Sequence, residues 1–195
     1  MLAMGTRRYF VLATVVMMLG MVAILAVPIM LTEEVEKKTL DALLIVGSYL
    51  EVIVAKALVG LTYTALAVAL MLALTRLRPE DLATFAAGTA ALSLSLIGVG
   101  LLIGGLFRNA QQVYSWSSVL LIPVIGPAFA VGLPIPDAVD IVLRVLPTSQ
   151  GMKIMANGLA GKTVFPDVAQ SYLVVIVWAA VAYGILAWRL SRRES

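Results

Sequence analysis

Carboxylates are the main side chains in this sequence that could carry out acid–base chemistry, and their positions argue against catalysis. The chain contains no histidine and no cysteine. This removes Ser-His and Cys-His nucleophilic catalysis, the HExxH metal motif and zinc sites built on cysteine. An enzyme or proton-driven carrier working inside a membrane would need carboxylates within its apolar segments. The aspartates instead fall at the ends of apolar runs or between them, at Asp41, Asp81, Asp137, Asp140 and Asp167.

The densest group of charges lies between the first two apolar runs. Two glutamate–lysine pairs have the four-residue spacing and the order that stabilise a helix surface, Glu33–Lys37 and Glu34–Lys38. Thr32 precedes them as a candidate N-cap, which would place the glutamates in the positive first turn of a helix. The pattern therefore predicts a short amphipathic helix over residues 33–46. Periodicity alone leaves open whether this helix only connects two segments or also binds another protein.

Long apolar runs determine the fold class. The 195-residue chain is 62% hydrophobic and 13% charged, and its mean hydropathy is +1.03. A soluble domain is about half apolar and a quarter charged, so a surplus of this size must be covered by lipid. Five runs reach the roughly 20 residues that a membrane-crossing helix needs, at about residues 9–31, 52–75, 82–107, 113–133 and 168–188. The sequence predicts one all-α domain over residues 1–195, a polytopic transmembrane helical bundle of five spans.

Residues 134–166 form a connection that is too apolar for a free loop. Prolines divide it into two short amphipathic pieces, at about residues 137–146 and 149–159, neither of which is long enough to cross a membrane. A re-entrant or interfacial hairpin fits these pieces best.

Small residues in the third run predict close helix packing. Gly100 and Gly104 form a GxxxG pattern, which lets helix backbones approach within one chain or across a dimer. No strand or phosphate-binding lysine accompanies the pattern, so it is not a nucleotide-binding loop. Basic residues are scattered at the ends of runs, and we expect no nucleic-acid partner.

The charged segment resembles a motif of the ABC type 2 transporter permeases. That family has an acidic and basic start, then Thr-Leu-Glu/Asp-x-Leu-Leu, a proline-containing turn, and Glu and Lys at the opening of the next span. The matching residues here are Glu33, Glu34, Glu36, Thr39, Leu40, Asp41, Leu43 and Leu44, followed by Glu51 and Lys56. A second likeness is the run from Leu146 to Ser149 and the helical piece after it, which is similar to the family's extracytoplasmic re-entrant hairpin.

The resemblance implies a mechanism. Residues 33–46 would be a cytoplasmic coupling helix that docks into a separate ATPase subunit and transmits its movement to the spans. The resemblance assigns the ATPase contact to five charged residues of this helix, Glu33, Glu34, Glu36, Lys37 and Lys38. It assigns packing of the helix onto the spans to Thr39, Leu40, Leu43 and Leu44. Glu51 and Lys56 would form a charged pair at the entry to the second span.

The resemblance also implies partners and a location. The chain would bind no cofactor itself, since ATP and magnesium belong to the ATPase. Its partners would be that ABC ATPase, a second permease copy or a companion permease, and the lipid bilayer. The location would be the prokaryotic plasma or inner membrane, and the activity would be ATP-driven export. The alternative is a non-transporting membrane scaffold or sensor built on the same fold.

Two departures from the family pattern affect the expected topology. The proline-containing turn is replaced by Gly47, Ser48 and Tyr49. The charged helix follows the first span, whereas in the family it follows the second, so we expect the family's first span to be missing, either genuinely or because the start is incomplete. Basic residues are almost evenly divided between the two sides of the membrane. The positive-inside rule, by which cytoplasmic loops carry more Lys and Arg, therefore does not orient the chain. The resemblance favours an outside N-terminus and a cytoplasmic C-terminus.

Overall fold

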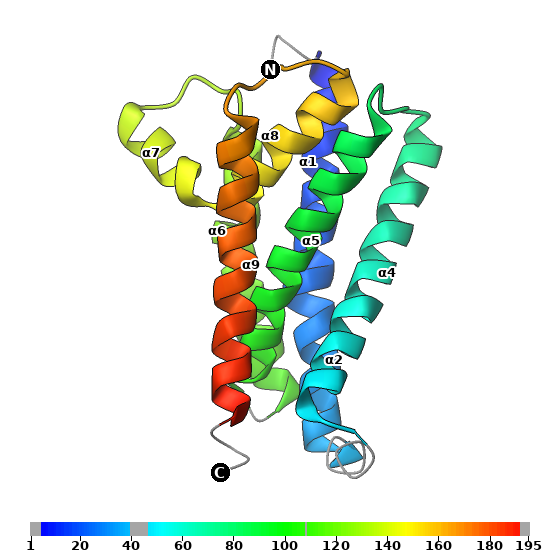
Figure 1. Cartoon of the computed structure of the whole chain (residues 1–195), viewed down its shortest axis with the longest axis vertical. Helices are drawn as coiled ribbons and strands as arrows, with labels where there is room; N and C mark the ends of the chain where they lie inside the picture. The colour runs from blue at the N-terminus through cyan, green and yellow to red at the C-terminus, as the bar shows by residue number, and fades with distance from the viewer. Residues whose placement is uncertain (1–4, 40–46, 108, 192–195) are drawn as a thin grey trace.

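A computed structural model describes residues 5–39, 47–107 and 109–191. The described part of the chain is helical and contains no strand. Five of its helices are long and apolar enough to cross a membrane. The predicted all-α bundle of five spans is therefore confirmed, and Figure 1 shows it as a set of roughly parallel rods.

The first span is one long helix with a local irregularity. It consists of α1 (Thr6–Met21), a π-helical turn η1 (Val22–Ala26) and α2 (Val27–Glu36). The Val27 N–H donates to the Val22 carbonyl, five residues back, which is the π-helical pattern. Pro28 follows and has no N–H to give to the previous turn, so the irregularity lies where proline disrupts helical bonding.

The remaining spans are α4 (Tyr49–Thr75), α5 (Leu82–Gly104), α6 (Ala110–Ala130) and α9 (Val168–Ser191). Their bounds differ from the predicted runs by at most three residues at either end. Helices α4 and α6 begin three residues before the predicted runs, because capping side chains rather than hydropathy fix where a helix starts.

Three of these spans begin at a polar N-cap. The side chains of Ser48, Asp81 and Asn109 each accept a hydrogen bond from the backbone N–H three residues later. Asp81, which lies between two apolar runs, therefore caps the third span. Hydrogen bonds from the Thr84 side chain and backbone lower the pKa of the Asp81 carboxyl below its ordinary value.

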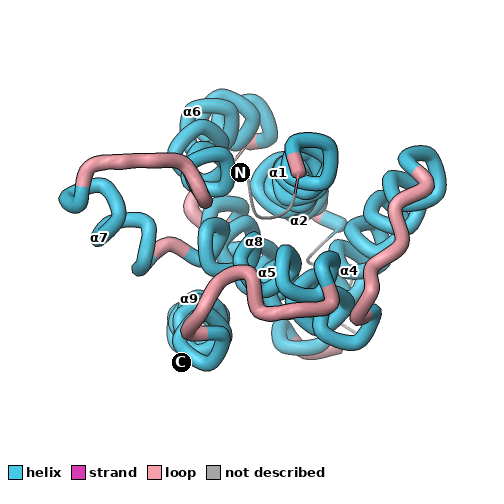
Figure 2. Tube along the Cα trace, turned by 90° about the horizontal axis from the view of Figure 1, so that it is seen from above, coloured by secondary structure: helices cyan, strands magenta, loops and turns pink. Residues whose placement is uncertain are grey.

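Helix α5 lies at the centre of the bundle. It contacts α4, α8, α9 and the first span, and Figure 2 shows these elements arranged around it. Consecutive spans alternate in direction. The lower end of the bundle in Figure 1 therefore holds the C-terminal ends of α2, α5 and α9 and the N-terminal ends of α4 and α6. The opposite, upper end carries the start of α1 and the turn between α4 and α5.

The connection before the last span contains two helices at the upper end, α7 (Asp137–Val145) and α8 (Pro147–Ala160). Helix α8 is buried along nearly its whole length and packs against α5 and α9. Helix α7 lies at the side of the bundle, with apolar side chains exposed at Val139, Ile141, Val142 and Val145. The two predicted helical pieces are therefore present. An apolar face exposed at the edge of a bundle is typical of an interfacial helix.

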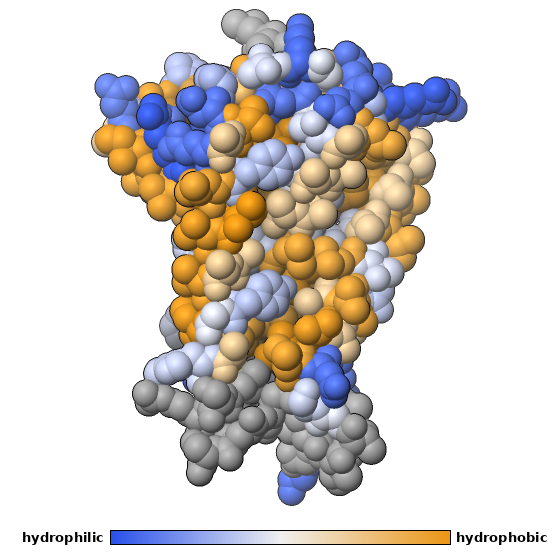
Figure 3. Space-filling model, in the orientation of Figure 1, coloured by the Kyte–Doolittle hydropathy of each residue, from blue (hydrophilic) through white to orange (hydrophobic). Residues whose placement is uncertain are grey.

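Polar groups mark the upper end of the bundle. In Figure 3 an apolar band lies below a polar upper end. At the upper end, the Arg7 guanidinium donates to the Thr75 carbonyl at 2.7 Å, at the negative C-terminus of α4. The adjacent Arg8 pairs with Glu80 at 3.0 Å. These two arginines therefore hold the start of α1 against the turn between α4 and α5.

Candidate functional site

The lower end gathers the charged residues that the sequence singled out. They belong to the last turn of α2, which we call the acidic turn (residues 33–36), and to the residues that follow it. The acidic turn continues the first span directly, so the predicted helix start at Thr32 is wrong. The glutamates therefore lie at the negative C-terminus of a helix instead of its positive N-terminus.

Thr32 has a different role from the predicted cap. Its side chain is fully buried, and its hydroxyl contacts the Pro28 carbonyl at 2.8 Å and the Gly104 carbonyl at 3.2 Å. A threonine within a helix commonly bonds to the carbonyl four residues back. The contact with Gly104 adds a link between the end of α2 and the end of α5.

Glu34 forms an ion pair with Lys56 of α4, a residue 22 positions later in the chain. Only 25% of the Glu34 side chain and 16% of the Lys56 side chain are exposed. The second carboxylate oxygen of Glu34 is buried and has no hydrogen-bond partner within the described part of the chain. Taking a charge out of water is costly, so each member of this pair depends on the other for compensation.

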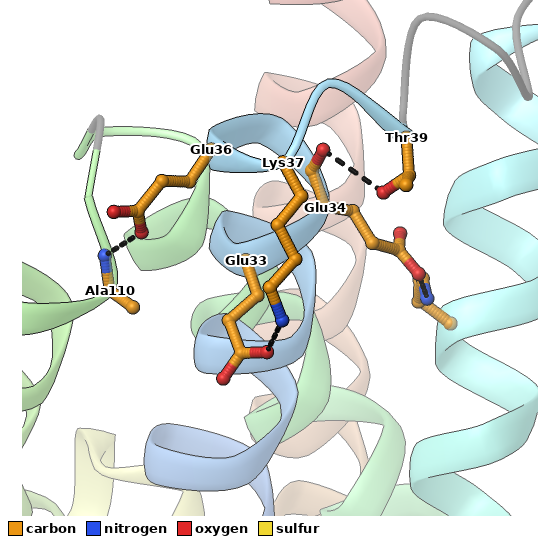
Figure 4. A network of polar contacts seen from close by, with 7 residues as sticks. Glu33, Glu34, Glu36, Lys37, Thr39 and Ala110 are labelled. Atoms are coloured by element: carbon orange, nitrogen blue, oxygen red, sulfur yellow. Dashed lines mark hydrogen bonds and ion pairs between the residues drawn. The ribbon is translucent and has the colours of Figure 1, made fainter.

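Glu36 reaches a third helix. Its carboxylate accepts a hydrogen bond from the Ala110 N–H at 3.2 Å, at the start of α6. The first N–H groups of a helix lack intrahelical partners and attract negative charge. Figure 4 shows Glu33, Glu34 and Glu36 pointing in different directions from the same turn of helix. The acidic turn is thus a junction between α2, α4 and α6.

The remaining charges of this region face solvent. Lys37 pairs with Glu33 at 2.8 Å, as predicted, with 67% and 46% of the two side chains exposed. The hydrogen bond from Lys37 to Glu33 raises the pKa of the lysine. Lys38 adopts a left-handed backbone conformation with φ 57° just past the end of the helix. It is therefore outside the helix that the predicted Glu34–Lys38 pair required, and Glu34 pairs with Lys56 instead.

Past this turn, Thr39 is exposed and its hydroxyl donates to the Glu34 carbonyl at 3.2 Å. Leu40, Leu43 and Leu44, and with them the second half of the predicted coupling helix (residues 40–46), lie outside the described residues.

Glu51 and Lys56, the charged residues at the entry to the second span, have separate partners. Glu51 accepts a hydrogen bond from the Ser48 N–H at 2.8 Å, while the Ser48 hydroxyl accepts one from the Glu51 N–H at 3.3 Å. This reciprocal capping box fixes the start of α4. Five residues of helix separate Glu51 from Lys56, which places them on different faces.

Gly100 and Gly104 lie where α5 crosses the first span. A Cβ atom added to Gly100 would be 1.8 Å from the Ala23 oxygen, and one added to Gly104 would be 3.0 Å from the Pro28 oxygen. Only glycine allows so close an approach of two backbones. The two glycines therefore set the position of α2, and with it the acidic turn, relative to α5.

Sequence reasoning missed the long-range partners of this site. Lys56 is the single charge inside the second apolar run, and that isolation signals a need for a partner. It does not identify Glu34, because the pairing depends on how deep each helix sits beside the other.

The comparison with protein families supplies the decisive observation. A family model described as "ABC-2 family transporter protein" matches residues 3–189. The chain belongs to this family. As an ABC-2 transporter permease, it is a multi-pass membrane protein with five candidate spans. The resemblance seen in residues 33–56 is therefore confirmed at the level of the family. No curated protein and no solved structure matches the chain.

Membership in the family gives the lower end a context. ABC-2 permeases are the membrane parts of ABC transporters, and the family implies an ABC ATPase as a partner in general. The charged residues around the acidic turn lie next to the break between the first two spans.

Proposed function

We propose that this chain is the permease subunit of an ATP-binding-cassette exporter, which moves its substrate with ATP hydrolysed by a separate ATPase subunit. The observation that carries the proposal is the family match over almost the whole chain. The chain would act with a second permease copy or a companion permease, in a prokaryotic plasma membrane with the lower end in the cytosol. ATP and magnesium would bind to the ATPase.

The lower end is the surface that would receive the ATPase. Lys37, Lys38 and Thr39 are exposed there, directly after a helix whose end is fixed by contacts to two other helices. A rigid helix end transmits a displacement because its packed side chains move as a unit. We assign the direct contact to the exposed charges, Glu33, Lys37 and Lys38. Glu34 and Glu36 would support that contact indirectly, because they fix the end of α2 against α4 and α6.

Charge reversal of Lys37 and Lys38 tests this surface. The double variant Lys37→Glu/Lys38→Glu is expected to lose co-elution with a co-expressed ABC ATPase, because two basic residues that attract an acidic partner surface would then repel it. The matched control is Arg78→Glu/Lys162→Glu, which changes the net charge by the same amount using residues at the upper end. Equal co-elution of the two double variants would contradict the assignment.

The orientation of the bundle is tested by labelling. The natural sequence has no cysteine, so a single introduced cysteine is the only thiol. A membrane-impermeant maleimide added to intact cells is expected to label Lys162→Cys at the upper end and to leave Lys37→Cys unlabelled. After the cells are opened, both variants should react. Labelling of Lys37→Cys from outside would place the lower end on the wrong side for an ATPase and would refute the proposed function.

A further inference from the structure

We propose that the Glu34–Lys56 ion pair is a positioning device that makes α2 and α4 move together when the segment between them is displaced. This inference rests on the proposed function, because it says how the movement of a bound ATPase would reach two spans at once. The pair joins the two helices that flank residues 37–48, and it does so inside the bundle.

The location of the pair gives it this effect. Lys56 lies seven residues after the start of α4, which corresponds to about 10 Å along the helix axis at 1.5 Å per residue. Glu34 lies in the last full turn of α2. The contact therefore connects the body of one span to the end of the other. Within residues 5–39 and 47–107, α2 and α4 have few other contacts with each other.

Burial makes the contact strong. The side chains are mostly shielded from water, and the second Glu34 oxygen has no partner among the described residues. Separating the two charges would leave each one poorly solvated, so the separated state is strongly disfavoured. The exposed Glu33–Lys37 pair in the same turn is screened by water and lacks this property.

The same residue is also attached to the exposed segment. The Glu34 carbonyl accepts the hydrogen bond from the Thr39 hydroxyl, while the Glu34 side chain holds Lys56. A push on residues 37–39 therefore acts on Glu34 directly, and the ion pair passes it to α4. Glu36, through the Ala110 N–H, adds a weaker and more exposed contact to α6.

A distance measurement on the full chain tests the proposal. Exposed residues on the two helices, Val35 and Val54, are replaced with cysteine and spin-labelled in a chain that has no other thiol. The protein is placed in lipid nanodiscs, alone and with its ATPase, and the distance between the labels is measured by pulsed electron resonance. With the pair intact we expect one narrow distance that stays the same with and without ATP.

The informative variant is Glu34→Gln/Lys56→Met, which removes the ion pair without leaving an unpaired charge. It is expected to fold and to retain the ATPase, but to widen the distance distribution about twofold and to make it shift on ATP binding. A purely structural pair would give a stable double variant with the wild-type distance. The control Glu33→Gln, in the same turn, should leave the distance unchanged.

The outcomes separate the two proposals. A narrow, ATP-independent distance in Glu34→Gln/Lys56→Met would overturn the inference, as would a wild-type distance that shifts with ATP. If no ATPase binds the wild-type chain, the proposed function fails. In that case the distance distribution measured without ATPase still tests the inference. An unwidened distribution in Glu34→Gln/Lys56→Met refutes the role of the ion pair, and a widened one supports it.

Discussion

Replacing Gly100 with alanine is expected to destabilise the bundle by about 3 kcal/mol, because overpacking of a tight contact forces the backbone to move. The added Cβ would meet the Ala23 oxygen at 1.8 Å, which no change of side-chain rotamer can relieve. The measurement is the thermal unfolding midpoint of the purified protein in detergent. For a chain of this size, the loss corresponds to a decrease of roughly 10 °C.

Two other glycines provide a graded comparison. Gly104→Ala should cost less, since its Cβ would be 3.0 Å from the Pro28 oxygen and a small shift relieves the contact. Gly184→Ala is the matched control, because the space around this glycine of α9 is open. Alanine is the better helix former there, so its midpoint should stay the same or rise. Equal midpoints for Gly100→Ala and Gly184→Ala would show that α5 does not cross the first span this closely.

Replacing Asn157 with alanine is expected to cost about 3 kcal/mol, because it leaves three backbone groups without partners. The Asn157 amide donates to the Phe165 carbonyl at 2.9 Å and accepts from the N–H groups of Val164 and Phe165 at 2.8 and 2.9 Å. The side chain is buried in α8 and holds the loop that leads into α9. We therefore expect faster tryptic cleavage after the exposed Lys162 in the folded protein, as well as a lower unfolding midpoint.

Asn157→Asp separates the two halves of this interaction. The carboxylate keeps both acceptor contacts to Val164 and Phe165 but loses the donor to the Phe165 carbonyl. Its cleavage rate and midpoint should lie between those of the natural protein and Asn157→Ala. If Asn157→Ala is cleaved no faster than the natural protein, the loop is held by something other than this amide.

The two ends of the bundle are built differently, and this supports a division of roles. At the upper end, α8 is buried against α5, and Arg7 and Arg8 hold the turn between α4 and α5. At the lower end, the acidic turn reaches α4 and α6 through polar contacts, with lysines exposed beside it. Apolar packing resists displacement over a large area, whereas a few directed polar contacts pass it between particular helices. Under the proposed function, an ATPase bound at the lower end would act on particular helices through these polar contacts.

The sequence alone determined the fold class and the family. Long apolar runs require helices because lipid offers no partner for backbone groups, so the number of spans follows from counting those runs. The residues from Glu33 to Lys56 were enough to indicate the permease family, since that pattern is local and continuous in the chain. Asp81 as a helix cap was equally predictable, because the preference of Asp for that position is local.

The tertiary structure decided which partners these residues have. Thr32 looked like the start of a helix because its neighbours fit a capping pattern, but the first span continues through it and packs it against Gly104. Lys56 had a nearby candidate in Glu51, yet its partner is Glu34, which is distant in sequence. Periodicity reports which face of a helix is apolar. It does not report which helix covers that face or at what depth, and the close crossing of α5 and the first span at Gly100 is visible only in the tertiary structure.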